Sequence, residues 1–104
     1  MRLNPIPTAT RLLPNYPNPF NPETWIPFEL HQTSVVTIQI YNSDGGQVQQ
    51  LELGQLPAGL YHTTDRAAYW NGQNQIGEQV ASGIYFYQLN LDDYRQTRKM
   101  VILK

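Results

Sequence analysis

Hydrophobic and polar residues alternate with a period of two along much of the chain. The alternation is clearest at residues 35–41, where Val36, Ile38 and Ile40 share one face and more polar side chains share the other. This period is typical of β-strands that bury one face, because successive side chains of a strand point to opposite sides of a sheet. No window of ten residues shows convincing helical periodicity, so the pattern predicts an all-β protein.

Segments rich in aromatic and β-branched residues recur between clusters of turn-forming residues. The cluster at 42–46 predicts a hairpin between strands at 35–41 and 47–53. Pro27 lies inside a further segment, 24–30, and cannot donate a ladder hydrogen bond, so we expect an edge strand there. About seven short strands in a chain of this length predict a single antiparallel β-sandwich. The remaining strands are expected at 60–66, 67–70, 83–91 and 94–103.

Prolines are concentrated near the start of the chain, where six of the eight lie within the first 22 residues. Proline breaks helices and favours extended backbone. We therefore expect a Pro-rich linker at 1–13 and one domain at 14–104. The first residues also lack the apolar segment of a signal peptide, so we expect none within this sequence.

Charge is scarce in this sequence. Charged residues make up 14% of the chain, against roughly 25% in typical soluble domains, and the net charge is −1. The chain thus lacks the basic surface on which nonspecific nucleic-acid binding depends. Eleven Gln, eight Asn and seven Tyr supply neutral polarity instead, a composition that suits an extracytoplasmic β domain. No apolar run is long enough for a membrane-spanning helix, so we expect no membrane insertion.

We expect no enzymatic activity, no metal and no cofactor. Cysteine is absent, which excludes disulfides, thiol catalysis and cysteine-ligated metals. His31 and His62 lack metal-ligand spacing and are expected at or near the surface, and Asp92 with Asp93 forms a solvated turn. Asp44 belongs to only a fragment of a calcium loop. None of the three serines lies in a nucleophile elbow: Ser34, Ser43 and Ser82.

The aromatic residues are candidates for both core and contact roles. We expect Trp70 to pack against the core with its indole N–H on a loop carbonyl. Tyr85 and Tyr87 share one strand face with Leu89, which predicts packing rather than ligand binding. Trp25 is out of phase with the apolar residues around it. It either covers one end of the sandwich or faces outward as a contact for a sugar or a protein.

Four cationic residues, Arg95, Arg98, Lys99 and Lys104, lie within the last ten residues. Three interpretations fit such a cluster. It is a solvated strand face, or it protects an edge strand from unwanted pairing, or it docks an acidic or β-augmenting partner. An exposed edge strand would also permit a strand-paired dimer.

Two groups of residues together carry a family resemblance, which covers residues 13–104. One is the run Tyr16, Pro17, Asn18, Pro19, Phe20, Asn21 and Pro22. The other comprises Trp70, Gly72, Gly77, Ser82, Gly83 and Tyr85. With the strand at 36–42 and the closing run at 98–104, they resemble the type A C-terminal sorting domain of type IX secretion cargo and the related Ig-like domain of the flagellar hook-capping protein. Asn71 departs from this pattern because the family often has Asp, and the two glycines at 45–46 replace a single-glycine turn.

These motif residues also have a physical role in folding. Phe20 is expected to plug one end of the sandwich, and the neighbouring asparagines to bond their own backbone in Asx turns. Gly72, Gly77 and Gly83 are expected to supply positive φ or close backbone approach. We therefore interpret the motif as mainly structural.

The resemblance implies an Ig-like sandwich that is a non-catalytic sorting signal. In that family a parent protein crosses the inner membrane, and the domain folds in the periplasm and is recognised by the outer-membrane type IX translocon. A sortase-like peptidase then removes it, here within 1–13, and the cargo reaches the cell surface or medium. Lys104 stands at the family's usual last residue. The residues expected to contact the partner are Arg98, Lys99, Met100, Val101, Ile102, Leu103 and Lys104.

Two other functions remain open from the sequence. The first is an Ig-like spacer or assembly module of the hook-capping kind, which binds a neighbouring subunit and carries no export signal. The second is a carbohydrate-binding module that uses Trp25 and exposed tyrosines.

Overall fold

The computed structural model describes residues 6–104, which form β-strands, turns and loops. Three hydrogen-bonded groups of strands run in the orders β1-β3-β6, β2-β7 and β5-β4-β8-β9, and every pairing within them is antiparallel. In the described part of the chain, no helix could span a membrane. The strands are β1 (Arg11–Leu12), β2 (Thr24–Ile26), β3 (Phe28–Leu30), β4 (Ser34–Asn42), β5 (Gln47–Leu56), β6 (Gly59–Tyr61), β7 (Ala68–Trp70), β8 (Gly83–Asn90) and β9 (Arg95–Ile102).

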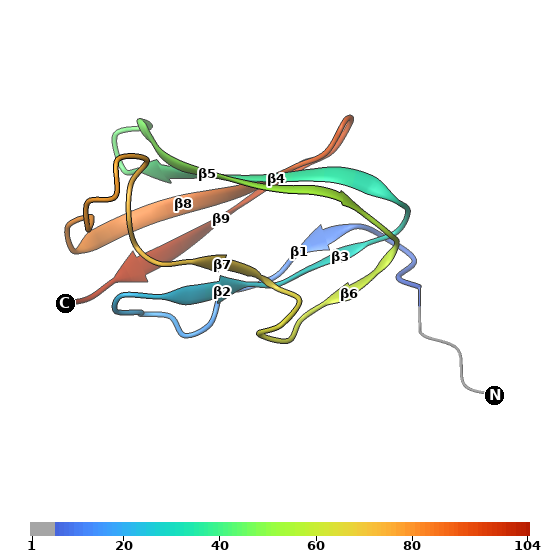
Figure 1. Cartoon of the computed structure of the whole chain (residues 1–104), viewed down its shortest axis with the longest axis horizontal. Helices are drawn as coiled ribbons and strands as arrows, with labels where there is room; N and C mark the ends of the chain where they lie inside the picture. Colours follow the sequence, from blue (N-terminus) through green and yellow to red (C-terminus); the bar gives the residue numbers. More distant parts are fainter. Residues whose placement is uncertain (1–5) are drawn as a thin grey trace.

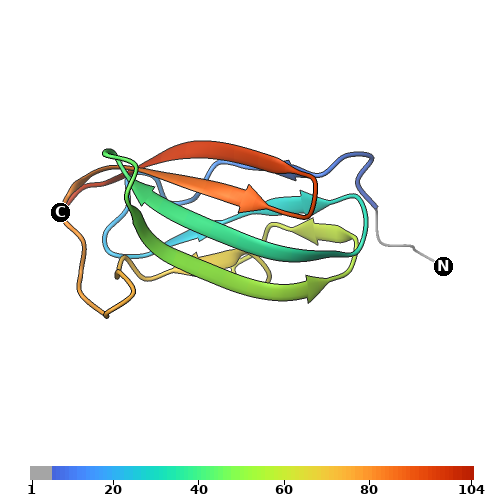
Figure 2. The same cartoon turned by 90° about the horizontal axis from the view of Figure 1, so that it is seen from above.

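The strands stack in two layers, which confirms the predicted all-β sandwich. The four-stranded sheet forms one layer, and β1, β2, β3, β6 and β7 form the other (Figure 1). Seen from above, β4 and β8 lie inside the four-stranded sheet, while β5 and β9 are its edges (Figure 2). The described start of the chain and its C-terminus lie at opposite ends of the sandwich (Figure 1).

The core lies between the two layers and follows the predicted alternation. Val36, Ile38 and Ile40 of β4 are fully buried, and so are Tyr87 and Leu89 of β8. Burying each such side chain contributes about 1.5–3 kcal/mol relative to leaving it in water. The strong period-two segments therefore hold the two sheets together, as expected.

Two strand predictions were wrong. The segment 24–30 is not one edge strand, because Pro27 separates β2 from β3 and the two strands join different partners. Moreover, β3 is an interior strand between β1 and β6. The predicted strand at 60–66 ends early, since the chain turns after Tyr61, where the N–H groups of residues 66 and 67 donate to the Thr63 carbonyl. The break at Pro27 adds one segment and β1 adds another, so nine segments replace the expected seven strands.

The folded part begins earlier than predicted. Residues 1–5 of the expected linker lie outside the described residues, but Arg11 and Leu12 form β1, and Leu12 is fully buried. The Tyr87 hydroxyl fixes the next residues, because it donates to the Leu13 carbonyl at 2.8 Å and accepts from the Asn15 N–H at 2.9 Å. Burial of this phenol raises the pKa of Tyr87 to about 12. Tyr87 thus ties the N-terminal segment to the four-stranded sheet.

Candidate partner-binding surface

The C-terminal strand β9 is an edge strand whose two faces differ. Met100 and Ile102 point into the core and are almost completely buried, whereas Lys99 on the opposite face is exposed. Since side chains alternate along a strand, the outer face of β9 carries residues 95, 97, 99 and 101. This outer face is the part of β9 that solvent, or a partner, reaches.

The Pro-rich motif covers the C-terminal end of β9. The Phe20 N–H donates to the Val101 carbonyl at 3.0 Å, and the Leu103 N–H donates to the Phe20 carbonyl at 3.1 Å. The Asn18 side chain accepts from the Val101 N–H at 3.0 Å, so it reaches β9 rather than forming the expected Asx turn. Two stretches about eighty residues apart in sequence are therefore joined at one edge. We name residues 15–22 the strap.

The Phe20 ring fills the end of the sandwich as expected. It is 2% exposed and meets the Trp70 ring edge to face, with 5.7 Å between ring centroids. Trp70 is itself buried, and its indole N–H donates to the Gln73 carbonyl at 2.9 Å, which confirms that prediction. The strap thus contributes both backbone pairing and core packing to the C-terminal strand.

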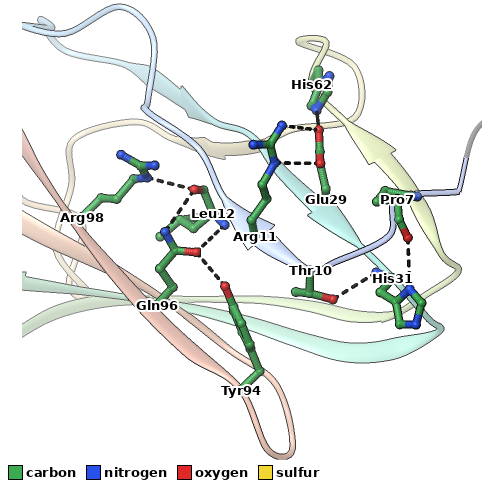
Figure 3. Close-up of polar contacts among 10 residues, drawn as sticks. All are labelled: Pro7, Thr10, Arg11, Leu12, Glu29, His31, His62, Tyr94, Gln96 and Arg98. Carbon is green, nitrogen blue, oxygen red and sulfur yellow. Dashed lines mark hydrogen bonds and ion pairs between the residues drawn. The ribbon is translucent and has the colours of Figure 1, made fainter.

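The N-terminal half of β9 contacts β1 through side chains. Arg98 Nε donates to the Leu12 carbonyl at 2.8 Å, and Gln96 Oε1 accepts from the Leu12 N–H at 2.9 Å. Figure 3 shows both side chains converging on Leu12, with the Tyr94 hydroxyl donating to Gln96 from the turn before β9. Arg98 and Gln96 consequently close the side of the sandwich between the two sheets.

These contacts narrow the expected partner surface. Within 98–104, Met100 and Ile102 belong to the core, and Arg98 is committed to Leu12, so a partner of the folded domain does not reach them freely. Lys99 is exposed, Leu103 is 64% exposed and Val101 is half-buried. The backbone N–H of Lys104 donates to Ser82 Oγ at 3.1 Å, and its ammonium group donates to the Val80 carbonyl. A partner would therefore meet Lys99, Val101, Leu103 and the exposed surface of Lys104.

The glycines of the motif allow the loop between β7 and β8 to fold. Gly72 has a φ of 79° and Gly77 a φ of 84°, as expected for positions that disfavour other residues. At Gly72 a Cβ atom would lie 2.4 Å from the Pro22 carbonyl oxygen, so this loop packs directly on the end of the strap. The Tyr85 hydroxyl donates to the Ala81 carbonyl at 2.8 Å and fixes the other end of the loop.

An ion cluster joins β1, β3 and the turn after β6. Arg11 Nε lies 2.9 Å from Glu29 Oε1, and His62 Nε2 lies 2.8 Å from Glu29 Oε2 (Figure 3). The hydrogen bond from Arg11 lowers the pKa of the Glu29 carboxyl, as does that from His62, although burial of Glu29 opposes the shift. His31 lies in a turn as predicted, and its Nδ1 is 3.0 Å from the Pro7 carbonyl oxygen. The cluster fixes β1 and contains no free nucleophile.

We expect Glu29→Gln to lower the free energy of unfolding at pH 7 by about 1–3 kcal/mol, because the amide loses two charge-assisted hydrogen bonds. The folded-state pKa of Glu29 is lowered, so its contribution is complete above the ordinary pKa and is lost as the pH falls through the folded value. The difference in free energy of unfolding between the native protein and Glu29→Gln should therefore shrink below about pH 4. Urea unfolding at pH 7 and pH 3 measures this, with Glu52→Gln at an exposed position of β5 as control. A difference that does not change with pH would contradict the prediction.

Trp25 faces away from the core. Its neighbours Thr24 and Ile26 are buried, whereas Trp25 is half-buried between the rings of Tyr16 and Tyr69, with centroid distances of 6.3 and 5.5 Å. The backbone of Trp25 also pairs with that of Tyr16 on one side and of Tyr69 on the other. Cross-strand aromatic pairs of this kind stabilise a sheet by roughly 0.2–1 kcal/mol each.

One hollow of the surface is lined by uncharged side chains. It has a volume of 430 Å³ and lies between the β4–β5 hairpin and the loop before β8. No carboxylate, histidine or amine lines it. Within residues 6–104, no three histidine or acidic residues gather as they would around a metal ion. The residues lining the hollow are Asn42, Gln47, Val48, Asn74, Gln75, Ile76, Val80 and Tyr85.

Comparison with known proteins supports the Ig-like architecture. One solved structure, dimeric latent PorU from Porphyromonas gingivalis, superposes with a TM-score of 0.64 at 16% sequence identity. The match covers 91% of this chain and 9% of that chain, and at this low sequence identity it shows the fold alone. The search of curated proteins finds no match. The family model described as the FlgD Ig-like domain matches residues 23–93. Because this match spans more than half of the chain, the protein belongs to the family of FlgD Ig-like domains.

Proposed function

We propose that this domain is a non-catalytic sorting signal that directs a parent protein through the outer membrane by the type IX secretion system. In this role the domain folds in the periplasm, and the translocon recognises its surface. A sortase-like peptidase then cuts within the expected linker, and the cargo reaches the cell surface or the medium. The proposal assigns the domain no catalytic role.

The observation that carries the proposal is the joining of the strap to β9. The most specific stretch of the resemblance lies within 15–22, and it hydrogen-bonds to the closing run 98–104 through Phe20, Val101 and Leu103. They form one edge at the end of the sandwich opposite the described N-terminal segment (Figure 1). A cargo that precedes residue 1 would leave this edge accessible, as recognition by a translocon requires.

The fold comparison is consistent with a small domain in a large protein. The chain corresponds to 9% of the length of the PorU chain that it resembles in fold. A sandwich of this kind therefore occurs as a minor part of a much longer polypeptide, which is the arrangement that a sorting domain needs.

A fusion experiment tests the proposal. Residues 1–104 are attached to the C-terminus of a periplasmic reporter in a cell that has a type IX system. We expect the reporter on the cell surface or in the medium, and we expect it in the periplasm when the translocon is inactivated. Retention of the fusion in the competent cell would overturn the proposal, provided that limited proteolysis shows the domain to be folded.

The second candidate function is an Ig-like spacer or assembly module. The match to the FlgD Ig-like domain favours it, because that family relation carries no requirement for export. A spacer would hold or join neighbouring subunits, and retention of a folded fusion in the periplasm would support it. The two functions therefore give opposite results in the same assay.

A further inference from the structure

The N-terminal half of β9, residues 95–99, has a free backbone edge. The carbonyl and the N–H of Val101 bond to Phe20 and Asn18 of the strap. These two backbone groups of Val101 therefore point away from β8. In an antiparallel ladder such outward groups recur at every second residue. The backbone groups of Arg95, Thr97 and Lys99 therefore also point away from β8. Within residues 6–104, no hydrogen bond occupies them.

Side chains around this free edge carry positive charge. Arg95, Thr97 and Lys99 are all exposed, and they share the outer face of β9. Thr97 accepts a hydrogen bond from Gln88 on β8 at 2.9 Å, which holds the middle of the edge in an extended form. The edge thus offers a pre-formed strand with a cation on each side of a β-branched residue.

Charge argues against pairing between two copies of this edge. An antiparallel pair that uses all three outward residues is centred on Thr97, so Arg95 of one copy would face Lys99 of the other. Like charges directly opposite each other destabilise a strand pair. Such a dimer would contain two pairs of Arg95 facing Lys99, one on each side of Thr97.

We infer that residues 95–99 bind an extended acidic segment of a partner protein, which adds as an antiparallel strand to β9. The partner would carry carboxylates four residues apart, opposite Lys99 and Arg95, and a β-branched residue between them opposite Thr97. Main-chain hydrogen bonds would supply the affinity and the two charge pairs the specificity. The inference rests on the proposed function for its biological setting, since it gives the chemistry of the partner.

A peptide titration followed by amide NMR of the full chain tests the inference. The probe is a capped heptapeptide of alternating Thr and Val with Glu at its second and sixth positions, and the control peptide has Lys at both. We expect the Glu peptide to shift the amide signals of Arg95, Thr97 and Lys99. Gln96 and Arg98 should shift less, because their N–H groups already pair with β8. Equal shifts with both peptides, or none with either, would overturn the inference.

Two variants separate strand addition from simple charge attraction. Thr97→Pro removes an N–H that the ladder with β8 does not use, so the sandwich should fold while peptide binding is lost. The double substitution Arg95→Glu with Lys99→Glu should weaken the binding of the Glu peptide about tenfold and allow the Lys peptide to bind instead. Unchanged binding by a folded Thr97→Pro protein would overturn the inference. These assays need no secretion, so their outcome is independent of the fusion experiment.

Discussion

Phe20→Ala is expected to lower the free energy of unfolding by about 3–5 kcal/mol. The Phe20 ring is 2% exposed and packs edge to face on Trp70, so truncation leaves a cavity at the end of the core. The backbone of Phe20 also pairs with β9, and that pairing depends on the strap being held in place. Because domains of this size have about 5–15 kcal/mol of stability in total, the loss should be large in urea unfolding followed by circular dichroism.

The matched control for Phe20 is Leu103→Ala. Leu103 lies beside Phe20, and its backbone donates to the Phe20 carbonyl, but its side chain is 64% exposed. Its truncation is expected to change stability by less than about 0.5 kcal/mol. If both substitutions cost the same, the strap does not pack into the core as described.

Gly72→Ala is the second substitution with a large expected effect, a loss of about 2–5 kcal/mol. Its φ of 79° disfavours any residue with a Cβ, at roughly 1–2 kcal/mol, and the added methyl group would lie 2.4 Å from the Pro22 carbonyl oxygen. Relieving that overlap must move backbone, which adds about 1–3 kcal/mol. Urea unfolding measures the sum.

Gly77→Ala isolates the conformational part of that loss. Gly77 has a similar φ of 84°, yet nothing lies within 4 Å of the position where its Cβ would be. We expect this variant to lose only about 1–2 kcal/mol. Equal losses at the two glycines would show that the loop does not press on the strap.

The strands that could be predicted are those with a strong local pattern beside a clear turn. The segment that became β4 places apolar residues at every second position, and the one that became β8 is a run of aromatic and aliphatic residues. The segment that became β9 carries its core residues, Met100 and Ile102, only in its C-terminal half. The hairpin at 42–46 was also recognisable, because its turn chemistry is local. Trp70 could be placed because a buried indole N–H needs a nearby acceptor.

What could not be predicted depends on contacts between distant residues. Pro27 indicated an edge strand, but the structure uses it as a break between two strands, which a local rule does not distinguish. The sequence predicts a linker through residue 13, because Leu12 is one apolar residue in a Pro-rich segment. Its burial depends on Gln96 and Arg98, more than eighty residues away. The pairing of Phe20 with Val101 likewise has no local signal.

We infer that the translocon recognises the outer face of β9, and the delivery of a reporter protein tests this inference most directly. The measurement compares a fusion that carries the native domain with one that carries Arg95→Glu and Lys99→Glu, in the same type IX-competent cell. Equal unfolding free energies of the two domains would first establish that the exposed charges do not affect folding. We expect the native fusion to reach the cell surface or medium and the charge-reversed fusion to stay in the periplasm. Equal delivery of both fusions would contradict the inference.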